Sequence, residues 1–156
     1  MPSLQQKSNR DAMKKVLLLF LLLIGCRAAL CQTNISMNGN WQFFFAKDMS
    51  TADSLVEKGF YRPEFEAEGF VSTPVPSNWA IQGFEEPVYR GFPDDKAGEG
   101  LYLHHFAVPA SFEGKRVLLH FGGVWNSAEV WLNGEWAGRH DSGFTSFSMD
   151  VTNLVK

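Results

Sequence analysis

The sequence predicts an all-β protein, a sandwich of antiparallel strands, on three observations between Lys115 and Met149. Apolar and polar residues alternate with a period of two in 117–121 and again in 128–132, the pattern of strands with one buried face. Asn133-Gly134 follows the second run and is a strong signal for a tight hairpin turn. No helical period interrupts the stretch, so the body is expected to pack around an antiparallel sheet.

The other strands are predicted from short apolar runs between turn residues. Trp41–Phe45 follows an expected turn at Asn38–Asn40, and two prolines favour an extended edge or linker at 73–76. With the hairpin region, this gives about seven strands at sandwich-like spacing. The remaining expected strands are 69–72, 101–108, 135–138 and 144–151.

Between the first two strands, residues 46–68 are mostly polar and are expected to form a surface excursion. Within it, Ala52–Lys58 is compatible with one or two helical turns. Ser50 or Thr51 would be the N-cap, because a hydroxyl oxygen there accepts from an unpaired amide of the first turn.

The N-terminal residues resemble a secretory signal. Lys14-Lys15 precede the nine apolar residues 16–24, a run too short to span a bilayer, which takes about 20. The competing interpretation is a buried helix. Leu23–Cys26 is similar to a bacterial lipobox, which would make Cys26 the lipidated residue, whereas Ala29–Cys31 offers another cleavage site.

These features divide the chain into two parts. Residues 1–31 are expected to be upstream overhang and a signal-peptide helix, and residues 32–156 the folded domain. The expected location is the bacterial periplasm or the outer-membrane surface, with membrane contact only through the signal or a lipid anchor. Both cysteines precede residue 32, so the domain must be stabilised by its core without disulfides.

The charge of the folded part excludes one class of partner. Beyond residue 31 the chain has nine Lys and Arg against sixteen Asp and Glu, a difference of −7. A net-acidic surface repels phosphate backbones, so nucleic-acid binding is not expected. The same part contains every Trp and Tyr, which suits both a sandwich core and exposed aromatic platforms for sugars.

Three separated motifs resemble the N-terminal domain of glycoside hydrolase family 2, the β-galactosidase group. Asn38–Phe43 is similar to the opening NGxWxF of that domain, and Val75–Tyr89 is similar to its VPSNWxxxGxxxPxY segment. The third motif runs from Phe121 to Gly134 and matches FxGVxSxxxVWxNG, with a continuation at 144–150. The resemblance covers about residues 37–156 with the motifs in the family's order.

The resemblance implies a jelly-roll β-sandwich of the galactose-binding-domain type. In the family this domain precedes an immunoglobulin-like domain and a (β/α)8 barrel, whose two glutamates catalyse retaining hydrolysis. No catalytic residue is therefore assigned in this chain, and the domain is expected to be incomplete at its C-terminus. One loop after the PxY segment contributes to the sugar site in the family, which makes Arg90, Asp94 and Asp95 the carbohydrate-contacting candidates by position.

Other residues have two interpretations each. Four tryptophans could be sugar platforms or packing residues: Trp79, Trp125, Trp131 and Trp136. Three aspartates are candidates for a structural calcium ion by acidic type alone: Asp48, Asp141 and Asp150. His104-His105 fall on opposite faces of a strand, and adjacent His140-Asp141-Ser142 cannot converge as a triad does. No metal-ligand spacing or phosphate-binding glycine loop is present, so neither a metal nor a cofactor is expected.

The leading hypothesis is the N-terminal sugar-binding domain of an exported β-galactosidase-like glycoside hydrolase. Its partners would be galactoside-like glycans and the other domains of the parent enzyme. The alternative is a free-standing carbohydrate-binding module without catalysis. A surface adhesion sandwich with a protein partner is a third interpretation.

Overall fold

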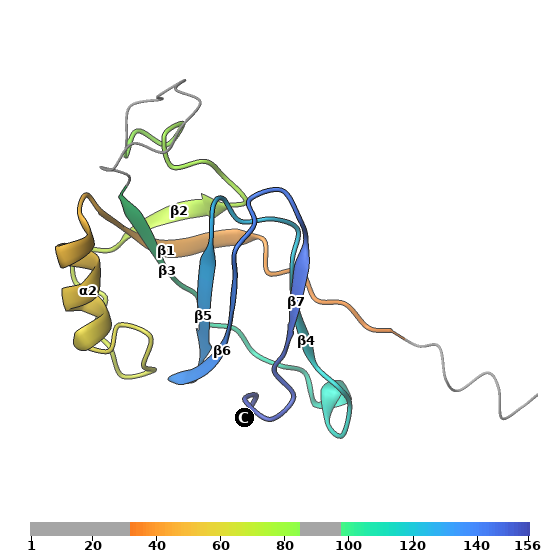
Figure 1. The fold of residues 1–156 in the computed structure, drawn as a ribbon. Helices are drawn as coiled ribbons and strands as arrows, with labels where there is room; N and C mark the ends of the chain where they lie inside the picture. The colour runs from red at the N-terminus through yellow and green to blue at the C-terminus, as the bar shows by residue number, and fades with distance from the viewer. Residues whose placement is uncertain (1–31, 85–97) are drawn as a thin grey trace, which may run out of the picture. The chain divides into compact units, whose positions relative to one another are not determined.

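The computed structural model describes residues 32–84 and 98–156 (Figure 1). The chain divides into two compact units, residues 1–36 and residues 37–156, and every described helix and strand lies in the second unit. The predicted signal-peptide helix lies outside the described residues.

The first three strands form one antiparallel sheet in the order β2-β1-β3, from β1 (Gly39–Ala46), β2 (Val71–Val75) and β3 (Glu99–Leu103). Proline has no amide hydrogen for a ladder, which suits Pro74 to the edge strand β2, as the prolines predicted. Several predicted bounds differ from the observed ones: the strand expected at 69–72 is found at 71–75, and the strand expected at 144–151 covers only 147–150. The turn expected at Asn38–Asn40 already belongs to β1 from Gly39 onward, and the strand expected at 101–108 ends at Leu103.

Helix α2 (Met49–Glu57) follows β1 directly, and its N-cap is Asp48 rather than the predicted Ser50 or Thr51. The Thr51 amide donates to Oδ1 of Asp48 over 2.8 Å, and the Ser50 hydroxyl donates to the same oxygen over 2.7 Å. A carboxylate at this position satisfies an unpaired amide of the first turn. The hydrogen bond from Ser50 is the largest of the effects that lower the pKa of Asp48.

The prediction that residues 46–68 form a surface excursion was wrong. Ala46, Ala52 and Phe60 are buried with Leu101 of β3 in one hydrophobic cluster, which Leu55 and Val56 of α2 also contact. Residues 52, 55 and 56 recur at helical spacing, so they form one apolar stripe that faces the sheet. Most of the polar residues that suggested an excursion are exposed, on the helix and in the turns.

The second half of the domain consists of two antiparallel strand pairs. β4 (Leu118–Phe121) pairs with β7 (Phe147–Asp150), and β5 (Ala128–Leu132) pairs with β6 (Glu135–His140). The predicted hairpin at Asn133-Gly134 is confirmed, since these residues have φ values of 53° and 83°, as a type I′ turn requires.

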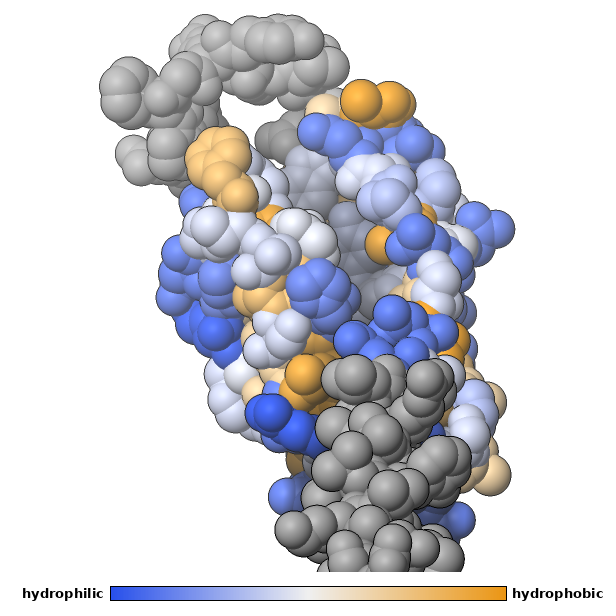
Figure 2. Space-filling model, turned by 90° about the vertical axis from the view of Figure 1, so that its right-hand side faces the viewer, coloured by the Kyte–Doolittle hydropathy of each residue, from blue (hydrophilic) through white to orange (hydrophobic). Residues whose placement is uncertain are grey.

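The two halves are the layers of a jelly-roll β-sandwich, and the predicted fold class is confirmed. In Figure 1, β4 to β7 run across the direction of β1. Trp131 of β5 packs against the cluster formed by β1, β3 and α2, so that cluster is shared by both layers. Figure 2 shows one side of the domain, where hydrophobic residues are scattered among hydrophilic ones.

Candidate functional site

The residues that the family pattern singled out lie outside the described part of the chain. Arg90, Asp94 and Asp95 belong to residues 85–97, and Cys26 belongs to residues 1–31. Their roles in carbohydrate contact and in lipidation stay predictions. The described residues nevertheless decide between the two interpretations of the four tryptophans.

Trp79 is a packing residue. Its ring lies 5.5 Å from that of Phe45 and 6.2 Å from that of Phe43, centroid to centroid. It also lies over Gly100 of β3, where an added Cβ would come within 2.4 Å of the indole Cζ3. The indole thus closes the face of β1 and β3 that is turned away from α2.

The segment around Trp79 is organised as the sequence indicated. The amide of Ala80 donates to Oδ1 of Asn78 over 2.8 Å, so Asn78 satisfies a local backbone group, as expected. Phe84 packs edge-on against Phe43 at 4.7 Å. Two rings of this short segment therefore attach it to the sheet.

Trp131 is also a packing residue. It stacks on Tyr61 with centroids 5.0 Å apart and meets Phe60 edge-on. Trp136, directly opposite on β6, contacts Trp131 at 5.1 Å but is 52% exposed. The turn end of the β5–β6 hairpin therefore carries one packed and one half-open indole.

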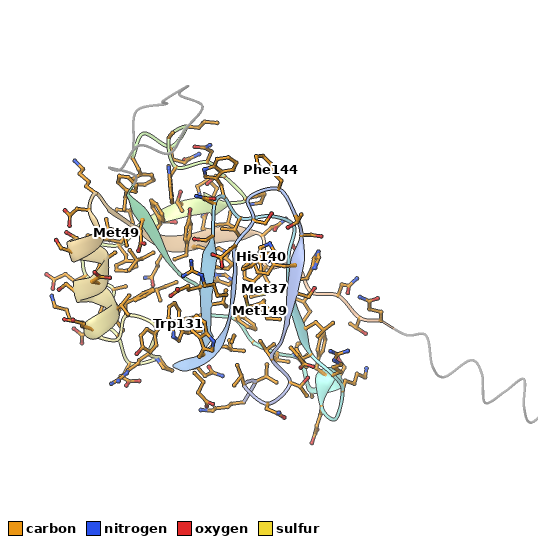
Figure 3. All side chains as sticks on the ribbon, in the orientation of Figure 1. Met37, Met49, Trp131, His140, Phe144 and Met149 are labelled. Carbon is orange, nitrogen blue, oxygen red and sulfur yellow. The ribbon has the colours of Figure 1, made fainter. Side chains whose placement is uncertain are left out.

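Trp125 and Phe144 form the most exposed aromatic pair among the described residues. Trp125 lies between β4 and β5 and is 66% exposed, and Phe144 lies between β6 and β7 and is 87% exposed. Their centroids are 5.0 Å apart with an interplanar angle of 82°. Figure 3 shows Phe144 and Trp131 toward opposite ends of the β5–β6 hairpin.

The loops that carry this pair contact each other and the neighbouring strands. Gly143 lies against the indole, since a Cβ there would come within 2.6 Å of Cε3 of Trp125. His140 Nε2 is 3.0 Å from the hydroxyl of Thr145, and this contact connects the end of β6 to the far side of the 141–146 loop. The His140 ring stacks on Phe147 at 4.2 Å, and Phe147 stacks on Phe121. The loop that carries Phe144 is therefore attached to His140 at the end of β6, whose ring belongs to a stack with Phe147 and Phe121.

The three aspartates considered as calcium ligands each have other partners. Asp48 caps α2, and Asp141 accepts from Arg139 over 2.8 Å. Asp150 accepts from Thr152 and from Arg116, which lower its pKa to about 2. In the described part of the chain, no three His, Cys, Asp or Glu side chains are grouped as metal ligands.

The carboxylates near Arg139 form a structural network. Arg139 bridges Glu129 of the neighbouring strand at 2.7 Å and Asp141 at 2.8 Å. Burial raises the pKa of Glu99, and the negative charges of Asp53 and Glu129 add to that rise. Glu129 and Asp141 both bind one guanidinium, so Arg139 links β5, β6 and the loop that follows β6.

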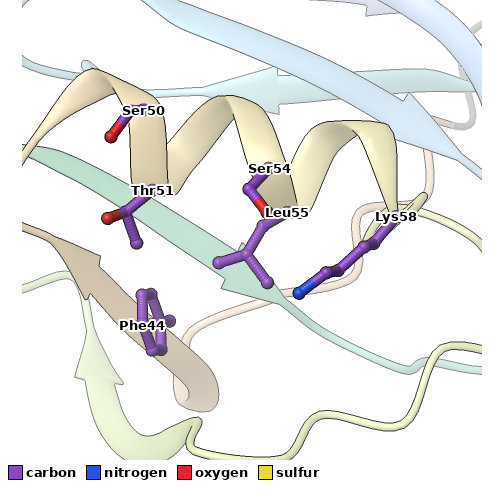
Figure 4. Close-up of a pocket in the computed structure, with 6 residues that line it drawn as sticks. All are labelled: Phe44, Ser50, Thr51, Ser54, Leu55 and Lys58. Carbon is purple, nitrogen blue, oxygen red and sulfur yellow. The ribbon is translucent and has the colours of Figure 1, made fainter.

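A shallow pocket lies between α2 and β1 (Figure 4). It has a volume of about 340 Å³, with hydroxyls on α2 and the ring of Phe44 on opposite walls. Its lining residues are Phe44, Ser50, Thr51, Ser54, Leu55 and Lys58. The Ser50 hydroxyl in this lining already donates to Asp48, the N-cap of the helix.

The described part is thus a β-sandwich that carries an exposed aromatic pair on the loops beside β5 and β6. The same type of domain emerges from comparison with known proteins: the profile described as "Glycosyl hydrolases family 2, sugar binding domain" matches residues 35–156. The chain belongs to glycoside hydrolase family 2. The three motifs seen in the sequence lie within this match, so the predicted membership is confirmed.

Individual relatives agree with the family. A β-galactosidase of Priestia megaterium is 32% identical over 136 residues, covering 78% of this chain and 13% of the relative. A β-galactosidase large subunit of Latilactobacillus sakei is 29% identical, covering 78% of this chain and 23% of the subunit. A solved β-glucuronidase from an uncultured Clostridium superposes with a TM-score of 0.60 at 26% identity, covering 81% of this chain and 22% of that one.

The chain therefore spans between 13% and 23% of the length of these relatives.

Within residues 32–84 and 98–156, the structure contains no helix long and apolar enough to cross a membrane.

Proposed function

We propose that this chain is the N-terminal sugar-binding domain of an exported β-galactosidase-like glycoside hydrolase that acts on O-glycosidic bonds in carbohydrate breakdown. The match to the family's sugar binding domain over residues 35–156 is the observation that carries the proposal. The two similar β-galactosidases favour a galactoside as substrate. In this enzyme the sandwich supports an immunoglobulin-like domain and a barrel and forms one side of the glycan site.

The proposed division of labour between the domains follows from the resemblance to the family. Retaining hydrolysis needs two carboxyl groups about 5 Å apart on either side of the scissile bond. Asp48, Asp141 and Asp150 of the described part are each occupied in a cap or an ion pair. Because the resemblance to the family implies that the catalytic pair lies in the barrel, this domain would contribute binding surface and Arg90, Asp94 and Asp95 from its loop.

The test is to sequence the locus beyond the codon for Lys156 and to express this chain with the polypeptide encoded there. We expect a sandwich and a barrel downstream, and hydrolysis of nitrophenyl β-D-galactoside only when the barrel is present. Nitrophenyl β-D-glucuronide is the control substrate, because a β-glucuronidase is among the similar structures. Unrelated downstream DNA, or enzymatic turnover by this chain alone, would contradict the proposal.

Export and lipidation need a separate test. We propose that the leader directs the chain to the periplasm or the outer-membrane surface, with Cys26 as the lipidated residue. Labelling with radioactive palmitate and cell fractionation should show a lipidated, membrane-associated protein. Cys26→Ala should abolish the label, whereas Cys31→Ala is the matched control and should keep it. A label that survives Cys26→Ala would exclude the lipobox.

A free-standing carbohydrate-binding module is the second candidate function. The exposed pair Trp125 and Phe144 is the observation that favours it, because such rings offer a binding face without catalytic groups. A locus that ends with this chain, together with glycan binding by the purified protein, would favour the module over the enzyme domain.

A further inference from the structure

We propose that Trp125 and Phe144 form a stacking platform for a neutral hexopyranose ring. The inference rests on the proposed function for the class of ligand, a sugar, and on the geometry of the two rings for its place. The platform consists of these two rings with the flanking loops 122–127 and 141–146.

The two rings are preorganised. The indole rests against the Gly143 backbone and is met edge-on by Phe144, at 82° and a centroid distance of 5.0 Å. In the loop that carries Phe144, the Thr145 hydroxyl lies 3.0 Å from His140 Nε2, and the His140 ring stacks on Phe147. Rings that already contact each other lose less conformational entropy when a ligand binds than two isolated rings would, which favours affinity.

The surroundings of the rings match the chemistry of a sugar. A pyranose has a face of C–H groups and a rim of hydroxyls. The flanking loops offer a corresponding rim of neutral side chains: Asn126, Ser127, Ser142, Thr145 and Ser146. Asp141 is the single charged residue in the two loops, and Arg139 already pairs with it. A neutral sugar therefore fits this surface better than a charged ligand.

The size of the platform also decides against a protein partner. A stable protein interface buries about 800 Å² on each side, whereas two aromatic side chains supply about 300–500 Å² at most. The flanking hydroxyls and amide would add polar surface that a protein partner must desolvate. One sugar ring needs only the aromatic faces and a few of these polar groups.

The test is a titration of the full 156-residue chain with methyl β-D-galactopyranoside, followed by tryptophan fluorescence and by calorimetry. Trp125→Ala and Phe144→Ala should each weaken binding by about two- to tenfold, the range expected for loss of one aromatic contact. Trp136→Ala is the matched control, since this indole is 52% exposed at the other end of the hairpin. It should leave the dissociation constant unchanged.

Circular dichroism and the unfolding midpoint establish that each variant is folded. Phe144 is 87% exposed, so its truncation removes almost no packing and keeps the test valid if Trp125→Ala fails to fold. Binding that is unchanged in Phe144→Ala overturns the platform, as does absence of binding by the folded parent chain. Neither result affects the hydrolysis test, so a failure here is distinguishable from failure of the proposed function.

Discussion

Aromatic rings are used in opposite ways in two regions of this domain. Phe43 of the β2-β1-β3 sheet is 0% exposed, because its ring is packed against the rings of Trp79, Phe84 and Tyr102. Around Trp125, one further ring meets the indole, and both rings remain largely in solvent. The first arrangement stabilises the fold, whereas the second presents a surface.

The difference follows from what lies above each ring. Trp79 and Phe84 belong to a segment that folds back on β1 and β3, so both rings shield Phe43 from solvent. Trp125 and Phe144 lie in connections between strands, with support from Gly143 beneath and little protein above. An aromatic residue is thus structural or available for binding according to its cover, and residue type alone does not decide it.

The largest expected effect comes from truncating one ring in each region. Phe43→Ala should destabilise the domain by about 3–5 kcal/mol, because it leaves a cavity among three packed rings. Phe144→Ala should change the free energy of unfolding by less than about 0.5 kcal/mol, as is usual for surface residues. Urea denaturation of both variants measures the difference. Similar losses in the two variants would remove the distinction between the regions.

A smaller effect is expected from filling the space beside each tryptophan. Gly100→Ala should cost about 1–3 kcal/mol, because the new Cβ would come within 2.4 Å of the enclosed ring of Trp79. Gly143→Ala should cost less, although its Cβ would come within 2.6 Å of Trp125, because a small shift of an indole that is 66% exposed relieves the clash without repacking the core. Thermal unfolding is the measurement.

Gly122→Ala is the control for these glycine variants, since no atom lies within 4 Å of its added Cβ. It should unfold at nearly the temperature of the parent chain. A loss for Gly143→Ala equal to that for Gly100→Ala would show that Trp125 is as firmly enclosed as Trp79.

The smallest effect concerns pH and the strand pair that supports the exposed region. Thr152 and Arg116 lower the pKa of Asp150 in the folded state to about 2, below its usual 3.8. The ionised form therefore stabilises the fold above about pH 4, and this contribution is lost as the pH falls from about 4 to about 2. Unfolding midpoints between pH 2 and pH 7 should show this loss in the parent chain.

Asp150→Asn should lower the midpoint at neutral pH and reduce the dependence below pH 4. Some dependence should remain, because the pKa values of Asp48 and Asp141 are also lowered by hydrogen bonds. An unchanged pH profile in Asp150→Asn would show that the Arg116–Asp150 pair contributes nothing to β4 and β7.

Much of the fold could be predicted from local sequence. The alternation of apolar and polar residues correctly predicted that Leu119 and Phe121 lie on the more buried side of β4. The Asn-Gly pair correctly predicted the hairpin, because its type I′ turn needs the positive φ values that Asn133 and Gly134 have. Both signals depend on neighbours in the chain. The cap of α2 was missed by two or three residues, because Asp48, Ser50 and Thr51 all carry suitable oxygens and only the observed start of the helix separates them.

The candidate site could be predicted only in part. The motif pattern identified the family, and composition identified the tryptophans as the residues to weigh. Their separation into packed Trp79 and Trp131 and exposed Trp125 and Trp136 could not be predicted, because the covering rings come from distant segments such as Tyr61.

By itself, the sequence determined the strand pattern, the hairpin and the family, since each is encoded in short-range periodicity, backbone preference or motif order. Tertiary structure alone decided that residues 46–68 enter the core and that Trp125 and Phe144 come together from separate loops. The physical reason is that burial is a property of the assembled layers, and no residue carries it before those layers meet.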